Sequence, residues 1–128
     1  MPAIDTPLLR SFLEGAIDNR EFHHADHVQV GFDLLQRVSF PEAAATYCAM
    51  LQAIAARAGR PEAFHMTITL AFLSLISERC AQSDFGDFSA FAHANPDLMT
   101  KSALGKWYAP ERLQSEIARK TFVLPERP

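Results

Sequence analysis

The stretch EAFHMTITLAFLSLISERC, residues 62–80, decides the fold class of this chain. Residues 67–69 are all β-branched, and short runs of such side chains favour an extended strand. The apolar run nevertheless continues through Ile76 without a turn signal. That length is typical of a buried helix and is too long for a typical strand. We therefore expect one buried helix over about residues 64–80.

Helical patterns also precede and follow this stretch. Thr6 and Pro7 suit the cap and first turn of a helix, and Gly59 followed by Pro61 is typical of a helix end. The apolar spacing predicts helices at about 6–18, 25–38, 41–58 and 64–80, with shorter helices after Asp87, at 110–113 and after Ser115. Pro125 favours an extended end that packs over the helices. The prediction is an all-α fold, a single domain over residues 1–128 with a bundle of four to five helices and an irregular C-terminal segment.

The composition is that of a globular domain. Of the 128 residues, 48% are hydrophobic and 21% are charged, which is ordinary for a folded chain. The net charge is -3, with 12 basic and 15 acidic residues, and no basic patch suggests a nucleic-acid partner. The start of the chain has no signal region, and no run of 18 apolar residues occurs, so we expect a cytoplasmic protein that does not enter a membrane. Cys48 and Cys80 are expected to be free thiols.

Residues 21–32, EFHHADHVQVGF, contain three of the five histidines. Extending the apolar face of the expected second helix backward from Gly31 reaches His27 and His24. These two histidines are three residues apart and are neighbours on the helix surface, so both imidazoles could reach one ion. His23 lies about 100° further round the helix and is expected at the rim. Gly31 indicates either room for a ligand beside His27 or close packing of two helices.

His65 is the third candidate ligand, because it begins the most apolar helix, where an unpaired imidazole is costly. With His24 and His27 it would supply three nitrogen atoms, a set that zinc, iron or copper accepts with an open coordination position. Asp26 is expected to have one of two roles. It either accepts a hydrogen bond from the N–H of a metal-bound imidazole, without binding the metal itself, or interacts favourably with the helix dipole. Without a metal, the same histidines could act as general acid and base.

Thr69 and Tyr108 are the expected substrate contacts. Thr69 lies one helical turn after His65. Thr67 and Thr69 cannot share a helix face, so at most one of them faces the site. Tyr108 lies in an irregular region, where it is expected either to anchor the C-terminal segment or to place its phenol near the histidines. The catalytic candidates are therefore Asp26, Thr69 and Tyr108.

These motifs resemble those of a family of small bacterial all-α proteins. F-H-H-A-D-H-V at 22–28 is similar to the family's H-x-D-H pattern, F-H-M-T-I-T at 64–69 to H-E-T-x-T, and Y-A-P-E-R-L-Q-S at 108–115 to Y-S-x-E-R-L-x-S. The resemblance covers about residues 22–125 and implies no particular reaction. The chain departs from it at Met66, where the family carries Glu, so any role of that Glu is missing here. The matching positions are His24, Asp26, His27, His65, Thr67, Thr69, Tyr108, Arg112 and Ser115.

The leading hypothesis is a metal-dependent enzyme that acts on a small-molecule substrate by hydrolytic or oxidative chemistry. Its divalent metal, zinc, iron or copper, would be held by His24, His27 and His65. The competing hypothesis is a non-enzymatic helical module that binds a small ligand or a partner helix, with the histidines as polar lining of its pocket. No nucleic-acid or membrane partner is expected, and a homodimer is compatible with the sequence.

Overall fold

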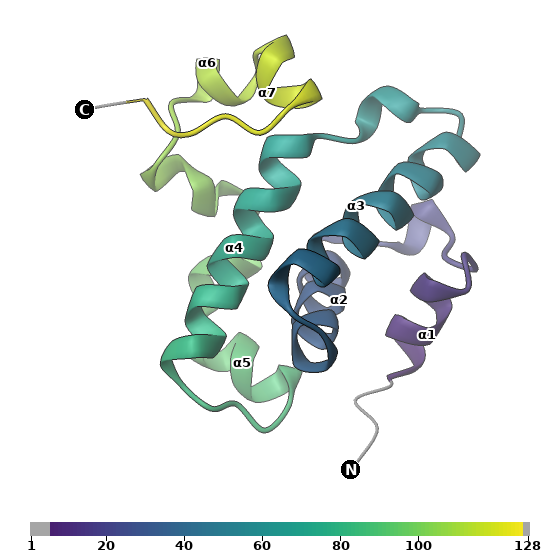
Figure 1. Cartoon of the computed structure of the whole chain (residues 1–128), viewed down its shortest axis with the longest axis vertical. Coiled ribbons are helices and arrows are strands. Elements are labelled where there is room, and N and C mark those ends of the chain that lie inside the picture. Colours follow the sequence, from purple (N-terminus) through teal and green to yellow (C-terminus); the bar gives the residue numbers. More distant parts are fainter. Residues whose placement is uncertain (1–5, 127–128) are drawn as a thin grey trace.

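All regular structure is helical in the computed structural model, which describes residues 6–126 (Figure 1). The α-helices are α1 (Pro7–Leu13), α2 (His24–Arg37), α3 (Phe40–Arg57), α4 (Met66–Gln82), α5 (Phe88–Ala94), α6 (Pro110–Leu113) and α7 (Glu116–Lys120). Between them lie the 3-10 helices η1 (Asn19–Glu21), η2 (Pro61–Ala63), η3 (Pro96–Met99) and η4 (Lys101–Lys106). The predicted all-α fold is confirmed.

Several helices begin at the caps that the sequence predicts. The side chains of Thr6, Asp87 and Ser115 each accept the backbone N–H of the residue three positions later, at 2.9 to 3.2 Å. These contacts satisfy donors that have no partner in the first helical turn. The first helix is shorter than predicted: it ends at Leu13, and Gly15 follows with a φ of 72°, a conformation that glycine adopts at little cost.

Gly31 marks the place where α2 packs against α4. A Cβ atom at this position would lie 3.1 Å from Ile76 Cδ1 and 3.2 Å from Leu73 Cδ1. Glycine therefore allows the two helices to approach more closely than alanine would without a shift of these side chains. Of the two explanations that the sequence leaves open for Gly31, close helix packing is the one observed.

Two hydrophobic clusters meet at α2, which contributes residues to both. One cluster joins α2 to α1 and α3 and includes Phe12, Leu34 and Tyr47. The other joins α2 to α4, α5 and the C-terminal third of the chain and includes Phe32 and Phe91. Burial of these side chains supplies most of the favourable free energy of folding. It also fixes α2, whose first turn carries the histidines, against four other helices.

The tail, residues 121–126, is extended and is held by side chains rather than by a neighbouring strand (Figure 1). Thr67 on α4 is fully buried and makes two hydrogen bonds to it. Its hydroxyl donates to the Thr121 carbonyl at 2.7 Å and accepts the Val123 N–H at 3.1 Å. Because a buried backbone group without a partner is costly, these bonds fix the path of the tail over the start of α4.

Two further residues of the C-terminal third hold the same tail. The hydroxyl of Tyr108, itself only 4% exposed, donates to the Val123 carbonyl at 2.7 Å. The Arg112 guanidinium donates to the Leu124 carbonyl through Nε at 3.1 Å and Nη2 at 2.9 Å. The expectation that an irregular C-terminal segment packs over the helices is met by these bonds.

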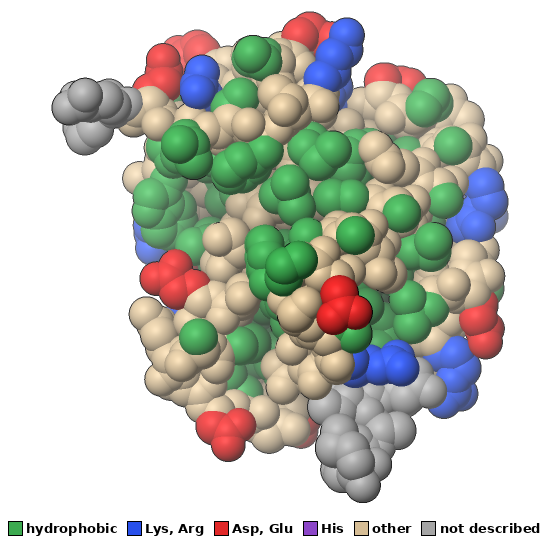
Figure 2. Space-filling view, in the orientation of Figure 1, with side chains coloured by type: hydrophobic (Ala, Val, Ile, Leu, Met, Phe, Trp, Pro, Cys, Tyr) green, Lys and Arg blue, Asp and Glu red, His purple; other side chains and the backbone are tan. Residues whose placement is uncertain are grey.

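None of the helices within residues 6–126 is long and apolar enough to cross a membrane. Large hydrophobic side chains are nevertheless exposed, and four of those in the described part of the chain belong to its C-terminal third. These four are Trp107, Ile117, Phe122 and Leu124. Figure 2 shows hydrophobic side chains gathered across the upper part of this face, with charged side chains mostly around its edges. This end of the molecule therefore presents an apolar surface to solvent.

Candidate functional site

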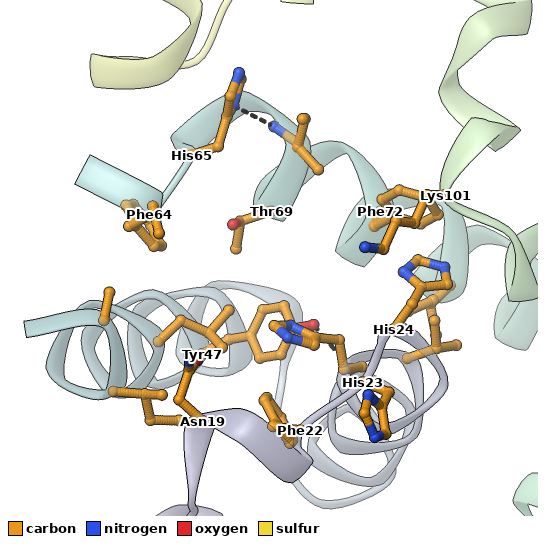
Figure 3. Close-up of a pocket in the computed structure, with 18 residues that line it drawn as sticks. Asn19, Phe22, His23, His24, Tyr47, Phe64, His65, Thr69, Phe72 and Lys101 are labelled. Atoms are coloured by element: carbon orange, nitrogen blue, oxygen red, sulfur yellow. Dashed lines mark hydrogen bonds between the residues drawn. The ribbon is translucent and has the colours of Figure 1, made fainter. Parts of the chain in front are cut away.

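A cavity of about 620 Å³ lies between the starts of α2 and α4 and the second half of α3 (Figure 3). Small-molecule pockets commonly have volumes of about 300–1,000 Å³ and apolar walls with a few polar groups. The apolar lining consists of Phe22, Val28, Tyr47, Leu51, Ile54, Ala55, Ala63, Phe64, Ile68, Phe72 and Ile76. The polar lining consists of Asn19, His23, His24, His27, His65, Thr69 and Lys101.

The helix phase inferred from the sequence places His24 and His27 on one face, and both line this cavity. His23 precedes α2 and is exposed at the cavity's edge. The backbone N–H of His23 donates to Asp26 Oδ2 at 3.0 Å. Asp26 therefore stabilises the start of α2 by accepting an otherwise unpaired backbone donor. Of the two roles predicted for Asp26, the structure shows the one at the helix start. Among the described residues no imidazole donates a hydrogen bond to Asp26.

His24 joins the start of α2 to the segment that contains η3. Its Nε2 lies 3.0 Å from the Leu98 carbonyl, and because a carbonyl only accepts, Nε2 carries the hydrogen. The edge of the imidazole packs against Phe72, with ring centroids 4.9 Å apart. In the neutral ring the remaining nitrogen, Nδ1, is then a hydrogen-bond acceptor. No described residue donates to Nδ1.

His27 has no hydrogen bond from its ring to any residue within 6–126. Its imidazole packs on Phe22, with ring centroids 4.2 Å apart. Burial is the main cause that lowers the pKa of His27 to about 4, the charge of His24 lowers it further, and Asp26 partly opposes the shift. The ring is therefore neutral near pH 7, with one donor and one acceptor nitrogen.

The backbone beneath His27 is fixed by Tyr47 of α3, whose hydroxyl donates to the His27 carbonyl at 2.8 Å. Burial raises the pKa of Tyr47, so its phenol remains a donor under ordinary conditions. This bond fixes the backbone from which the His27 side chain projects. No sequence pattern indicated Tyr47 as a residue of the site.

His65 uses both ring nitrogens to hold the protein together. Its Nδ1 accepts the Ile68 N–H at 3.1 Å, so His65 is the N-cap of α4. Its Nε2 donates to the Leu113 carbonyl at 2.6 Å. In Figure 3 the His65 ring is turned away from His24, toward the C-terminal part of the chain. Neither nitrogen is left to bind a metal ion.

Within residues 6–126 no group of three or more His, Cys, Asp or Glu side chains could hold a metal ion. The structure therefore does not bring His24, His27 and His65 together as the predicted three-nitrogen set. The physical reason is the cap at His65. The sequence places this histidine at a helix start, but helix phase cannot show that its ring turns back onto the backbone.

Thr69 lines the cavity, and its hydroxyl makes no hydrogen bond within the described chain. Thr67, two residues earlier, faces the tail instead. This division agrees with the expectation that the two threonines occupy different faces. Tyr108 lies outside the cavity and holds Val123, which is the tail-anchoring alternative; its predicted contact with substrate has no counterpart in this arrangement.

Lys101 is the lining residue that no sequence pattern indicated. It begins η4, which follows η3 directly. The Leu98 carbonyl of η3 is bonded to His24, so both segments lie near the start of α2. In Figure 3 the Lys101 amino group lies beside the His24 ring. A single lysine in a short polar turn carries no periodic signal. Its position depends on the packing of segments about 75 residues apart in sequence.

Comparison with known proteins gives no match: no family model, curated protein or solved structure is significantly similar to this chain. The motifs must therefore be interpreted from their geometry alone. They divide into two groups. His24, His27 and Thr69 line the cavity, whereas Thr67, Tyr108, Arg112 and Ser115 either hold the C-terminal part of the chain or cap its helices. His65 does both, because it lines the cavity and uses its ring nitrogens to cap α4 and to hold Leu113.

Proposed function

We propose that this protein binds a small, mainly apolar molecule in the cavity between α2, α3 and α4. The observation that carries the proposal is a set of polar groups with no partner in the described chain. His24 Nδ1, the His27 ring and the Thr69 hydroxyl all belong to residues that line an otherwise mainly apolar cavity. Polar groups placed in this way orient a ligand inside an apolar pocket.

His27 is the central group of this proposal. A neutral imidazole donates one hydrogen bond through one nitrogen and accepts one through the other. Phe22 packs on one side of the ring, and the Tyr47 bond fixes the backbone that carries it. These features suit recognition of a ligand that carries a hydroxyl or carbonyl group on an apolar body.

A neutral apolar dye, N-phenyl-1-naphthylamine, tests the proposal by its increase in fluorescence on binding. We expect one dye per chain. Thr69→Phe, which fills the cavity, weakens binding more than tenfold, whereas Ser74→Phe on an exposed face of the same helix leaves it within twofold. Circular dichroism and thermal unfolding establish that both variants are folded. Equal dye binding by the parent and Thr69→Phe would contradict the proposal.

A metal-dependent reaction is the second candidate, and it rests on His24 and His27 alone. These two histidines are three residues apart on one helix and line one cavity, which is the spacing that allows two nitrogen ligands to reach one ion. Elemental analysis after incubation with zinc, iron(II) or copper(II) tests it. One tightly bound equivalent that is lost in His27→Ala but kept in His65→Ala would favour this second candidate.

A further inference from the structure

The charge around the cavity is one-sided. Lys101 is the single charged side chain among the described lining residues, and none of these residues is Asp or Glu. The other lining side chains are apolar or neutral polar groups, together with histidines. A bound molecule therefore meets one positive charge and no negative charge.

Lys101 also has no ion-pair partner within residues 6–126. The two nearest lysines in sequence are both paired: Lys106 lies 3.7 Å from Asp97, and Lys120 lies 3.5 Å from Glu116. Lys101 is itself exposed and lines the rim of the cavity, and its charge makes a minor contribution to the lowered pKa of His27. An anionic group of a bound molecule can pair with it there.

The one positive charge lies at one end of the cavity, whereas the polar side chains toward the other end, Asn19 and His65, carry no negative charge. Figure 3 shows Lys101 and His24 side by side, whereas Phe64 lies across the cavity from them. A ligand that fills such a space has a charged head and an apolar body. One lysine balances one negative charge, so a monoanion fits better than a dianion.

Resting on the function proposed above, we infer that the ligand is a small organic carboxylate whose carboxylate pairs with Lys101 beside His24 and whose apolar body fills the cavity toward Phe64. Lys101 acts as a point charge with three donors, which suits a carboxylate without requiring the bidentate geometry of an arginine. The apolar walls contribute affinity, and Lys101 selects the head group.

Three probes of equal chain length test this inference by isothermal titration calorimetry: octanoate, octanol and octyl phosphate. We expect octanoate to bind about tenfold more tightly than octanol, and octyl phosphate to bind no more tightly than octanoate. In Lys101→Met, octanoate affinity falls to that of octanol, and octanol affinity is unchanged. The control Lys106→Met, which removes a lysine outside the cavity, leaves all three affinities within twofold.

The outcomes separate this inference from the proposed function. Equal binding of octanoate and octanol that Lys101→Met does not alter overturns the carboxylate inference and leaves the apolar pocket standing. Tighter binding of octyl phosphate than of octanoate also overturns it, in favour of a phosphate head. Absence of binding by all three probes, with no binding of the neutral dye, overturns both.

Discussion

Replacement of Thr67 by valine, compared with the same replacement at Thr69, separates the two roles of the start of α4. Thr67 is 0% exposed, and its hydroxyl makes two hydrogen bonds to the tail, to Thr121 at 2.7 Å and from Val123 at 3.1 Å. Valine keeps the shape of the side chain and removes both bonds. Thr69 makes no such bond, so the second substitution is its matched control.

The magnitude follows from the groups left behind. An unsatisfied buried group costs about 1–3 kcal/mol. The Val123 N–H is buried and loses its partner completely, whereas Thr121 is exposed and its carbonyl can be hydrated. We therefore expect Thr67→Val to lower the free energy of unfolding by about 2–3 kcal/mol. Thr69→Val is expected to change it by less than about 0.5 kcal/mol.

Urea denaturation followed by circular dichroism measures both values. Fluorescence of Trp107, the single tryptophan, which precedes the tail anchor Tyr108, gives an independent signal for the C-terminal part of the chain. Coincident transitions would support two-state unfolding. Losses of stability that are equal in the two variants, or larger in Thr69→Val, would refute the assignment of Thr67 as the tail anchor.

Three further predictions test other parts of the structure. His65→Ala removes a helix cap and the bond to the Leu113 carbonyl, and should lower the free energy of unfolding measured in urea by about 2 kcal/mol. His65→Asn keeps a cap acceptor and should lower it by about half as much. An unchanged stability in His65→Ala would exclude the capping role. The pKa of His27 is lowered from 6.5 to about 4 in the folded protein, so the unfolded chain binds the proton more tightly. The free energy of unfolding therefore decreases as pH falls from about 6.5 to 4, by at most about 3 kcal/mol. His27→Asn should reduce this slope, and identical slopes measured at several pH values would contradict the assignment. Gly59 has a φ of 75°, so Gly59→Ala should lower stability by about 1 kcal/mol, whereas Gly86→Ala, with open space around it, should leave the melting temperature nearly unchanged.

The helices are predictable from the sequence because their signals are local. Apolar spacing, proline at the first turn and side chains such as Ser115 act within four residues of the backbone that they organise. The long apolar run at 62–80 distinguishes a helix from a strand by length alone. The predicted start at residue 64 differs from the observed start at Met66 because the His65 cap excludes the preceding residues from the helix.

The candidate site is only partly predictable, because it depends on contacts between distant segments. Helix phase correctly places His24 and His27 together, since both lie on one helix. It cannot show that the His65 ring caps its own helix, or that η4 brings Lys101 to the start of α2. The same limit applies to Tyr108, whose position near the tail depends on how the C-terminal third folds back.

His65 connects the two halves of the molecule, because its ring contributes to the cavity wall while its Nε2 holds the Leu113 carbonyl. Two residues later Thr67 faces the tail, and after two more Thr69 faces the cavity, as expected from a rotation of about 200° between positions two apart on a helix. One helical turn therefore serves a structural surface and a binding surface. If this division is correct, Thr67→Val lowers stability but leaves octanoate affinity within threefold, because its bonds lie on the tail side. Thr69→Val shows the opposite pattern, with unchanged stability and altered affinity. A variant that lost both properties to the same extent would show that the tail and the cavity form one cooperative unit, and the assignment of separate roles to the two threonines would be wrong.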